Sequence, residues 1–155
     1  MIDVKWTSDD LSKYVQAKEY IDTAIVPLVG FQMNAENKMN KDAFQREVLS
    51  IYTNEIEKEL SGRLLLAPNY NYIKTKDLSE EVTRLNKWVE HINEQPFSNI
   101  FLLTFDNQWK KEEKNLDGEL LWFPSLEHDS LKSEETIRTI RSQVNQISEL
   151  IRTYW

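Results

Sequence analysis

The sequence predicts an α/β protein: a three-layer α/β/α sandwich with a mostly parallel sheet of about four strands, in a Rossmann-like or flavodoxin-like topology. Apolar segments of strand length alternate with amphipathic segments of helix length, which is typical of β–α–β units. One such strand, residues 24–29, is apolar at nearly every position, as expected for a strand that helices cover on both faces. The length of 155 residues, without a Pro/Gly/Ser-rich linker, predicts a single α/β domain over residues 1–155.

The first half of the chain predicts two helices and two strands. Thr7 provides a cap for a helix that ends near Tyr20, and the strand 24–29 follows. Pro27 lacks an amide proton, so we expect a bulge or a strand end there. Residues 34–40 are polar and predict a turn. The periodic apolar positions of residues 44–60 then predict a long helix with Gly62 as its C-cap, before a short strand over residues 63–67.

The second half repeats this alternation. Residues 69–72 predict a loop, Asp77 begins a helix that ends before Pro96, and residues 98–105 predict a third strand. A short helix over residues 108–115 and a fourth strand of open direction over residues 119–123 follow. Apolar residues spaced by three and four from Ser133 onward predict a final helix that packs on the sheet.

Composition excludes several function classes. The chain has 40% hydrophobic residues and a formal charge of −7, which predicts a folded domain and disfavours nucleic acid binding. It has no cysteine, so disulfides, thiolate nucleophiles and zinc–thiolate sites are excluded, and a cytoplasmic location is expected. Its longest apolar stretch, residues 24–31, is far shorter than the ~20 residues that span a bilayer. We therefore expect no membrane insertion.

Four segments resemble the YpiF-like family, an uncharacterised bacterial family of unknown function. They are WTSDD at residues 6–10, QAKEYIDTA followed by VPL at residues 16–28, LWFP at residues 121–124, and the final YW. The resemblance covers essentially the whole chain. It implies a bacterial cytoplasmic protein and supplies no catalytic residue.

No cofactor motif is present. Dinucleotide and nucleotide loops need closely spaced glycines, whereas this chain has Gly30, Gly62 and Gly118, far apart. No nucleophile elbow accompanies the two histidines, His91 and His128, and the adjacent carboxylates around His128 are poorly placed for one metal ion. We therefore expect no cofactor, no metal and no catalytic residue, and the sequence leaves enzymatic activity open while favouring its absence.

The carboxyl ends of parallel strands provide the candidate ligand site. In open α/β sheets, ligands bind beyond these ends, where the strand order reverses. The expected strand ends place Tyr70, Asn71, Asp106 and His128 there as candidate ligand-binding residues, with Asn34 and Asn107 beside them. The alternative is structural: Asn and Asp terminate strands by local hydrogen bonds, and the tyrosines pack over the sheet edge.

The leading functional hypothesis from the sequence is an interaction or regulatory module without chemistry of its own. Trp6, Trp109 and Trp155 lie near helix starts or chain ends, where they could anchor a protein partner or could close the rim of the core. A homodimer through the final helix is a further possibility. The second hypothesis is a small polar-ligand-binding domain, or a diverged enzyme, with its site at the carboxyl edge of the sheet.

Overall fold

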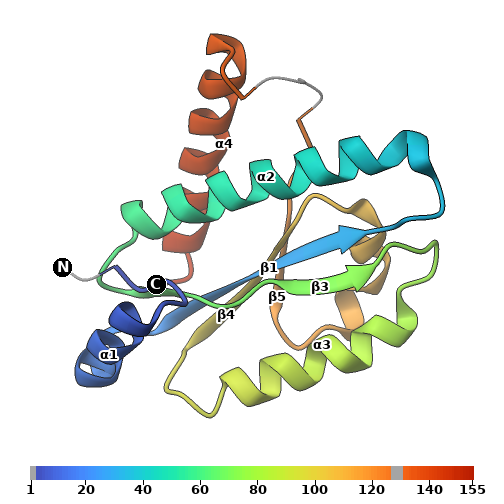
Figure 1. The fold of residues 1–155 in the computed structure, drawn as a ribbon. Coiled ribbons are helices and arrows are strands. Elements are labelled where there is room, and N and C mark those ends of the chain that lie inside the picture. Colours follow the sequence, from blue (N-terminus) through green and yellow to red (C-terminus); the bar gives the residue numbers. More distant parts are fainter. Residues whose placement is uncertain (1–2, 127–130) are drawn as a thin grey trace.

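A computed structural model describes residues 3–126 and 131–155. Within them, one parallel sheet contains the strands β1 (Thr23–Phe31), β2 (Leu64–Leu66), β3 (Tyr70–Ile73), β4 (Asn99–Thr104) and β5 (Glu119–Trp122). The α-helices are α1 (Ser8–Ala17), α2 (Glu36–Glu59), α3 (Ser79–Ile92) and α4 (Glu134–Arg152), and two 3₁₀ helices span Lys18–Tyr20 and Asn107–Asn115. The predicted three-layer α/β/α fold is confirmed (Figure 1).

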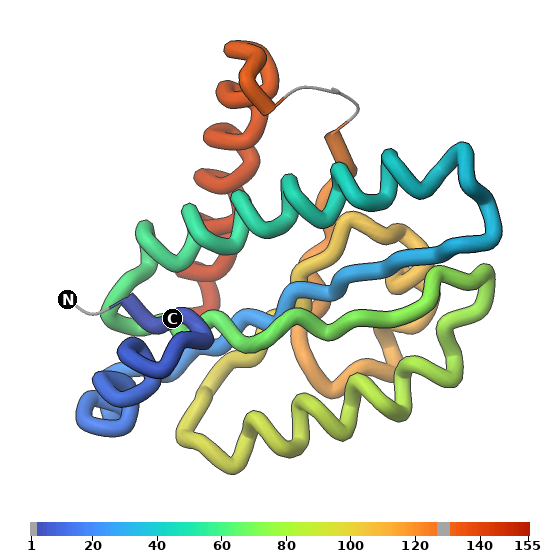
Figure 2. The backbone as a smooth tube through the Cα atoms, in the orientation of Figure 1, coloured from blue at the N-terminus to red at the C-terminus, as the bar shows by residue number. Residues whose placement is uncertain are grey.

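The spatial order of the strands is β2-β1-β4-β5, and β3 also pairs with β1. Thr23 of β1 lies in register with Leu64 of β2, and Leu28 lies in register with Tyr70 of β3. The two short strands therefore act as one neighbour that runs along the whole length of β1 (Figure 2). Counted in this way, the order equals the first four positions of the flavodoxin-like sheet, and the order reverses between β1 and β4.

Helices cover both faces of the sheet. Ile25, Val29 and Phe101 point to the face covered by α2 and α4, where they pack with Tyr52 and Ile147. The opposite face carries the alternate strand residues and is covered by α1 and α3, with residues such as Val26, Leu102 and Leu85 in its core (Figure 1). The alternation of side chains along each strand therefore builds two apolar cores, one on each face.

The expectation that Pro27 marks a bulge or strand end is wrong, because β1 continues through it to Phe31. Thr23 donates its amide to Arg63 and Ile25 accepts from Ala67, so these alternate residues direct their backbone groups towards β2. Pro27 faces the same side, where β2 has ended at Leu66 and β3 has not yet begun. Its missing amide proton therefore falls in an interruption of the neighbouring strand and removes no ladder hydrogen bond.

The turn expected at residues 34–40 is also wrong, because α2 begins at Glu36. Its first turns are exposed and carry no apolar stripe, so hydrophobic periodicity does not detect them. The N-cap Ala35 has no capping side chain. Gln32 instead orders the segment just before the helix: its Oε1 accepts from the amides of Asn34 and Ala35 at 3.1 and 2.8 Å, and its Nε2 donates to the Ala35 carbonyl. A glutamine three residues upstream thus holds the backbone that enters α2.

The loop expected at residues 69–72 is wrong as well, because these residues form most of β3. Tyr70 and Tyr72 are buried while Asn71 and Ile73 are exposed, which is the period-two alternation of a half-covered strand. The asparagines of this segment favour a loop by local propensity. Pairing with β1 and burial of two tyrosines outweigh that preference. The fourth expected strand, β5, is parallel to β4.

Candidate functional site

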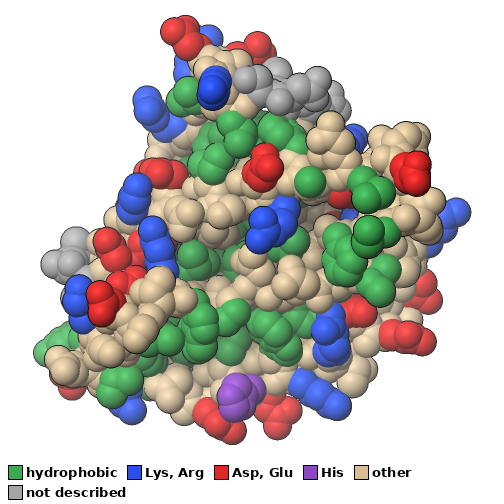
Figure 3. Space-filling view, viewed as in Figure 1, with side chains coloured by type: hydrophobic (Ala, Val, Ile, Leu, Met, Phe, Trp, Pro, Cys, Tyr) green, Lys and Arg blue, Asp and Glu red, His purple; other side chains and the backbone are tan. Residues whose placement is uncertain are grey.

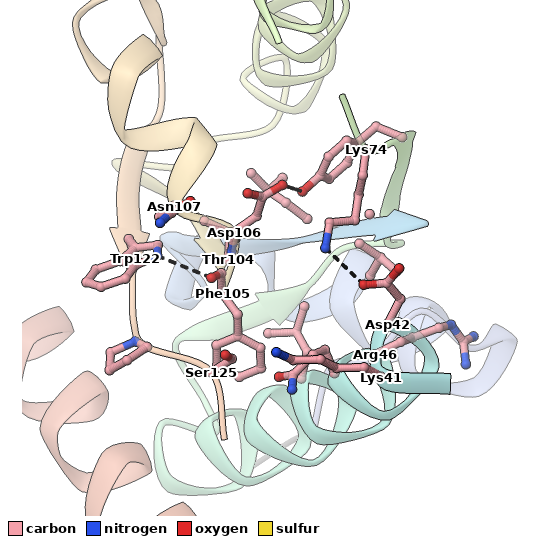
Figure 4. A pocket seen from close by; sticks show the side chains of 17 residues that line it. Lys41, Asp42, Arg46, Lys74, Thr104, Phe105, Asp106, Asn107, Trp122 and Ser125 are labelled. Atoms are coloured by element: carbon pink, nitrogen blue, oxygen red, sulfur yellow. Dashed lines mark hydrogen bonds and ion pairs between the residues drawn. The ribbon is translucent and has the colours of Figure 1, made fainter. Parts of the chain in front are cut away.

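A pocket of about 370 Å³ lies at the carboxyl ends of the strands, where the strand order reverses. Leu28, Val29 and Gly30 of β1 form one part of its wall, and residues 104–107 after β4 form another. The N-terminal half of α2 and the segment after β5 complete it (Figure 4). Crossovers that leave β1 and β4 in opposite directions open a crevice between these strands, which is why ligands bind there in open α/β sheets.

The pocket wall has a basic side and a side with two aromatic rings. Lys41 and Arg46 of α2 and Lys74 after β3 supply the basic groups. Trp122 and Phe105 lie across the pocket from Lys74 and Asp42 (Figure 4). Leu28, Leu49 and Pro124 add apolar surface to the lining.

Both acidic residues of the pocket are already engaged by neighbours. Asp42 accepts hydrogen bonds from Lys74 Nζ and Gln32 Nε2, each at 2.9 Å. Asp106 Oδ2 accepts from the Tyr72 hydroxyl at 2.7 Å, and its Oδ1 accepts from the Gln108 amide at 3.0 Å. Their carboxylates therefore hold the wall together, with about half of the acceptor capacity of each already used by the protein.

Tyr72 connects the pocket wall to the core. Its ring is buried and packs edge-on against Trp109, with ring centroids 5.2 Å apart. Burial and the neighbouring Asp106 carboxylate raise the pKa of Tyr72, so its hydroxyl stays protonated and donates to Asp106 at neutral pH. The hydrogen bond fixes Asp106 at the end of β4.

Gly30 allows β3 to approach the pocket closely. A Cβ atom at this position would lie 2.6 Å from Lys74 Cγ and 2.8 Å from Tyr72 Cζ. Such contacts are too short for any side chain at Gly30 without movement of its neighbours. The glycine that stands alone at the end of the first predicted strand therefore makes room for two pocket side chains.

The structure separates the four ligand-binding candidates of the sequence. Asp106 lines the pocket. Tyr70 is fully buried on the α3 face, where its hydroxyl donates to Glu81 Oε1 at 2.6 Å, and Asn71 is exposed beside Arg84, so neither lines the pocket. Because β3 prolongs the β2 side of the sheet, the carboxyl end moves from Tyr70 to Lys74. His128 lies outside the described residues, as does Glu127.

Sequence reasoning missed Lys41, Arg46 and Lys74. Lys41 and Arg46 belong to the helix that follows β1, and this helix borders the crevice in any sheet of this order. Reading residues 36–41 as the first turns of α2 could have pointed to them. Lys74 could be found only through β3, which determines where the β2 side of the sheet ends.

A second hollow, the α1–α3 groove, lies between these two helices and encloses about 610 Å³. Its lining is mainly apolar and includes Leu11, Val15, Trp88 and Phe97. Figure 3 shows apolar side chains exposed along this part of the surface. Trp6, one of the proposed partner anchors, lines the groove and is 58% exposed.

The other two proposed anchors are held by the fold in different ways. Trp109 has no exposed surface and belongs to the α3-side core, so it cannot anchor a partner in this conformation. Trp155 is 36% exposed, donates from Nε1 to Thr23 Oγ1 at 2.9 Å, and has Arg63 stacked over its ring at 3.8 Å from the centroid. For Trp109 the alternative interpretation, an aromatic ring that packs in the core, agrees with the structure.

The described part of the chain has neither a metal-binding cluster nor a helix that could span a membrane. Among residues 3–126 and 131–155, no three His, Asp or Glu side chains lie together as a metal-binding group. In the same part of the chain, no helix has both the length and the apolar character needed to cross a membrane.

The fold and pocket define an open-sheet α/β protein with a polar crevice at the reversal of strand order. The chain belongs to the DUF2487 family, whose model, described as a protein of unknown function, matches residues 12–155. It is 34% identical over 133 residues to the uncharacterised protein YpiF of Bacillus subtilis (strain 168), covering 83% of this chain and 85% of that protein. The resemblance to the YpiF-like family is thereby confirmed. No solved structure matches the chain.

Proposed function

We propose that this protein binds a small polar ligand in the carboxyl-edge pocket. The observation that carries the proposal is the position of the pocket: it opens where β1 and β4 send their crossovers to opposite sides. Its volume of about 370 Å³ suits a ligand of metabolite size, because ligand pockets enclose roughly 300–1,000 Å³.

Binding without covalent chemistry accounts best for the side chains of the pocket. The described lining offers amines, a guanidinium, amides, carboxylates and the hydroxyls of Thr104 and Ser125. A hydroxyl nucleophile needs a general base within reach. Thr104 Oγ1 instead accepts a hydrogen bond from the Asp106 amide at 2.9 Å, which makes it part of the wall.

A thermal-shift screen of polar metabolites, followed by amide NMR titration, tests the proposal. A ligand at a hundred times its dissociation constant should stabilise the fold by ~2.7 kcal/mol. Asn107→Trp places a large ring at the pocket lining, on an exposed residue whose side chain forms no hydrogen bond with the described residues, and should abolish the shift. Asn93→Trp makes the same change on an exposed residue outside the pocket and should not. Equal ligand responses in both variants, or no response to any compound, would refute the proposal.

The interaction function that the sequence favours stays a prediction. The α1–α3 groove is the described surface that suits it, because Trp6 and Val15 remain 58% and 67% exposed beside a wall of apolar side chains. Light scattering after size exclusion would test for a homodimer through this groove. A dimer that dissociates on Trp6→Ser substitution would support it, and a monomer at all concentrations would exclude it.

A further inference from the structure

Among the described residues that line the carboxyl-edge pocket, basic groups outnumber acidic groups, on a chain whose formal charge is −7. Lys41, Arg46 and Lys74 line the pocket together with two carboxylates, Asp42 and Asp106. A locally positive pocket on an acidic protein attracts anions that the rest of the surface repels.

Two of these three cations have no internal partner. Lys74 forms an ion pair with Asp42, with the charged atoms 2.9 Å apart. Within residues 3–126 and 131–155, neither Lys41 nor Arg46 forms an ion pair or a side-chain hydrogen bond, although other charged residues of the fold do, such as Arg63 with Asp22. In the described part of the chain, these two positive charges beside the pocket are therefore not paired with a carboxylate.

The carboxylates of the pocket strengthen this asymmetry. Because Asp42 and Asp106 each accept two hydrogen bonds from the protein, they are held in the wall by existing donors. A cationic ligand would have to displace these donors or share the acceptors with them. An anionic ligand meets free donors on Lys41 and Arg46, which form charge-assisted hydrogen bonds with phosphoryl and carboxylate oxygens.

The opposite wall carries the aromatic rings of the pocket. Trp122 and Phe105 lie across from Lys74 and Asp42 in Figure 4, among polar lining residues. The Lys110 ammonium lies over the Trp122 ring, 4.2 Å from its centroid. A ligand with a charged group near α2 can therefore place an apolar part against the aromatic rings near β5.

We propose that the ligand of the carboxyl-edge pocket carries an anionic group, a phosphoryl or a carboxylate, that binds beside Lys41, Arg46 and Lys74, and an apolar body that contacts the Trp122 side. This inference depends on the proposed function, because it names the ligand class of the same pocket. Free Lys41 and Arg46 side chains bind the anion, while Lys74 contributes charge through its place in the ion pair with Asp42.

Three probes that share one ring and differ in charge provide the test: phenyl phosphate, benzoate and phenol, each titrated into isotope-labelled protein. At least one of the two anions should bind about tenfold more tightly than phenol, which corresponds to the worth of a charge-assisted hydrogen bond. Phenyl phosphate and benzoate distinguish a phosphoryl from a carboxylate preference. Inorganic phosphate, which lacks the ring, should bind more weakly than phenyl phosphate if the apolar wall contributes.

Matched variants decide whether the basic groups are responsible. The double substitution Lys41→Ala with Arg46→Ala should weaken the binding of the anions about tenfold or more and leave the affinity for phenol unchanged. Lys38→Ala with Lys58→Ala removes two positive charges from exposed positions of the same helix outside the pocket and should leave all three probes unchanged. Arg46→Glu, which reverses one charge, should also weaken the binding of the anions. Amide spectra of this variant check that it keeps the fold.

The possible failures are distinct. The inference is overturned if phenol binds as tightly as the anions, or if both double variants lose the same amount of anion affinity. Ligand binding in the pocket would still stand in either case. If neutral compounds from the metabolite screen bind and neither anion does, the inference is likewise overturned while the proposed function stands. If no compound of the screen or of the probe set binds, the proposed function fails together with the inference.

Discussion

The two ends of the sheet differ in how their polar groups are used. At the amino end, Arg63 donates to Asp22 from both Nε and Nη2, at 3.2 and 2.7 Å, and stacks over Trp155. Trp155 in turn donates to Thr23 at the start of β1. At the carboxyl end, Lys41 and Arg46 lie beside an open pocket with no ion pair in the described part of the chain. One end is closed by the chain's own C-terminal residues, whereas the other end leaves charge available.

This difference separates stability from binding. Groups that are satisfied internally stabilise the fold and have little capacity left for a ligand, while unpaired groups contribute little to folding. Substitutions at the amino end should therefore change the free energy of unfolding without changing ligand binding. Substitutions of the free cations at the carboxyl end should do the opposite. The predictions below test this contrast, beginning with the largest expected effect.

The packed support beneath the pocket should show the largest loss of stability. Trp109 is fully buried against Tyr70 and Tyr72, so Trp109→Ala leaves a cavity and should cost ~3–5 kcal/mol. Trp109→Phe keeps a ring in the core and leaves a smaller cavity, so it should cost clearly less. Urea denaturation measures both variants. Equal losses in the free energy of unfolding would show that the size of the cavity does not determine the loss of stability.

The closure of the amino end should give the next largest effect. Trp155→Ala removes the hydrogen bond to Thr23 and the stacking of Arg63, and we expect a loss of ~1–3 kcal/mol in the free energy of unfolding. Trp6→Ala is the matched control: this ring is more exposed, so its loss should change stability by less than that of Trp155. Similar losses in the two variants would contradict a specific role for the C-terminal ring.

The Asp22–Arg63 pair should give a smaller effect that depends on pH. Burial alone would raise the pKa of Asp22, but the hydrogen bonds and charge of Arg63 hold it below its usual value. The ionised carboxylate therefore stabilises the fold above the unfolded pKa of ~3.9, and this contribution is lost as the pH falls through the lower folded pKa. Asp22→Asn should cost under ~1 kcal/mol at pH 7, because the pair is partly exposed, and less below pH ~3.9. A cost independent of pH would contradict the ionic contribution.

The free cations of the pocket should give the smallest effect on stability. Lys41→Ala with Arg46→Ala should change the free energy of unfolding by no more than ~0.5 kcal/mol, because neither side chain has an ion pair to lose in the described residues. Chemical denaturation without ligand provides the measurement. A loss similar to that of Trp155→Ala would mean that these residues support the fold, and the contrast between the two ends would fail.

Hydrophobic patterning was sufficient to predict the layers of this fold, and it failed at two segments where tertiary contacts decide. The apolar runs of β1 and β4 and the stripe of α4 identify themselves locally, because each needs burial wherever it lies. The first turns of α2 have no such stripe, and Gln32 holds the backbone just before them from outside the helix. β3 contains Asn71 and directly follows Asn69, and it becomes a strand only through its pairing with β1.

The candidate site follows the same division. Asp106 could be predicted because it directly follows a strand that is evident from the sequence. Tyr70 and Asn71 were placed at the sheet edge only because β3 was read as a loop, and the same error hid Lys74. The asymmetry of charge in the pocket depends on which acids have internal donors, and residues such as Tyr72 and Gln32 come to those acids from other elements.

By itself the sequence determined an acidic, cysteine-free α/β chain with parallel strands and helices on both faces, because composition and periodicity are properties of neighbouring residues. Only the tertiary structure decided that β3 lengthens one side of the sheet, that Trp155 closes the amino end, and that Lys41 and Arg46 stay unpaired beside the pocket. Those outcomes depend on contacts between residues far apart in the chain, and local pattern does not encode which distant group will satisfy a given donor or acceptor.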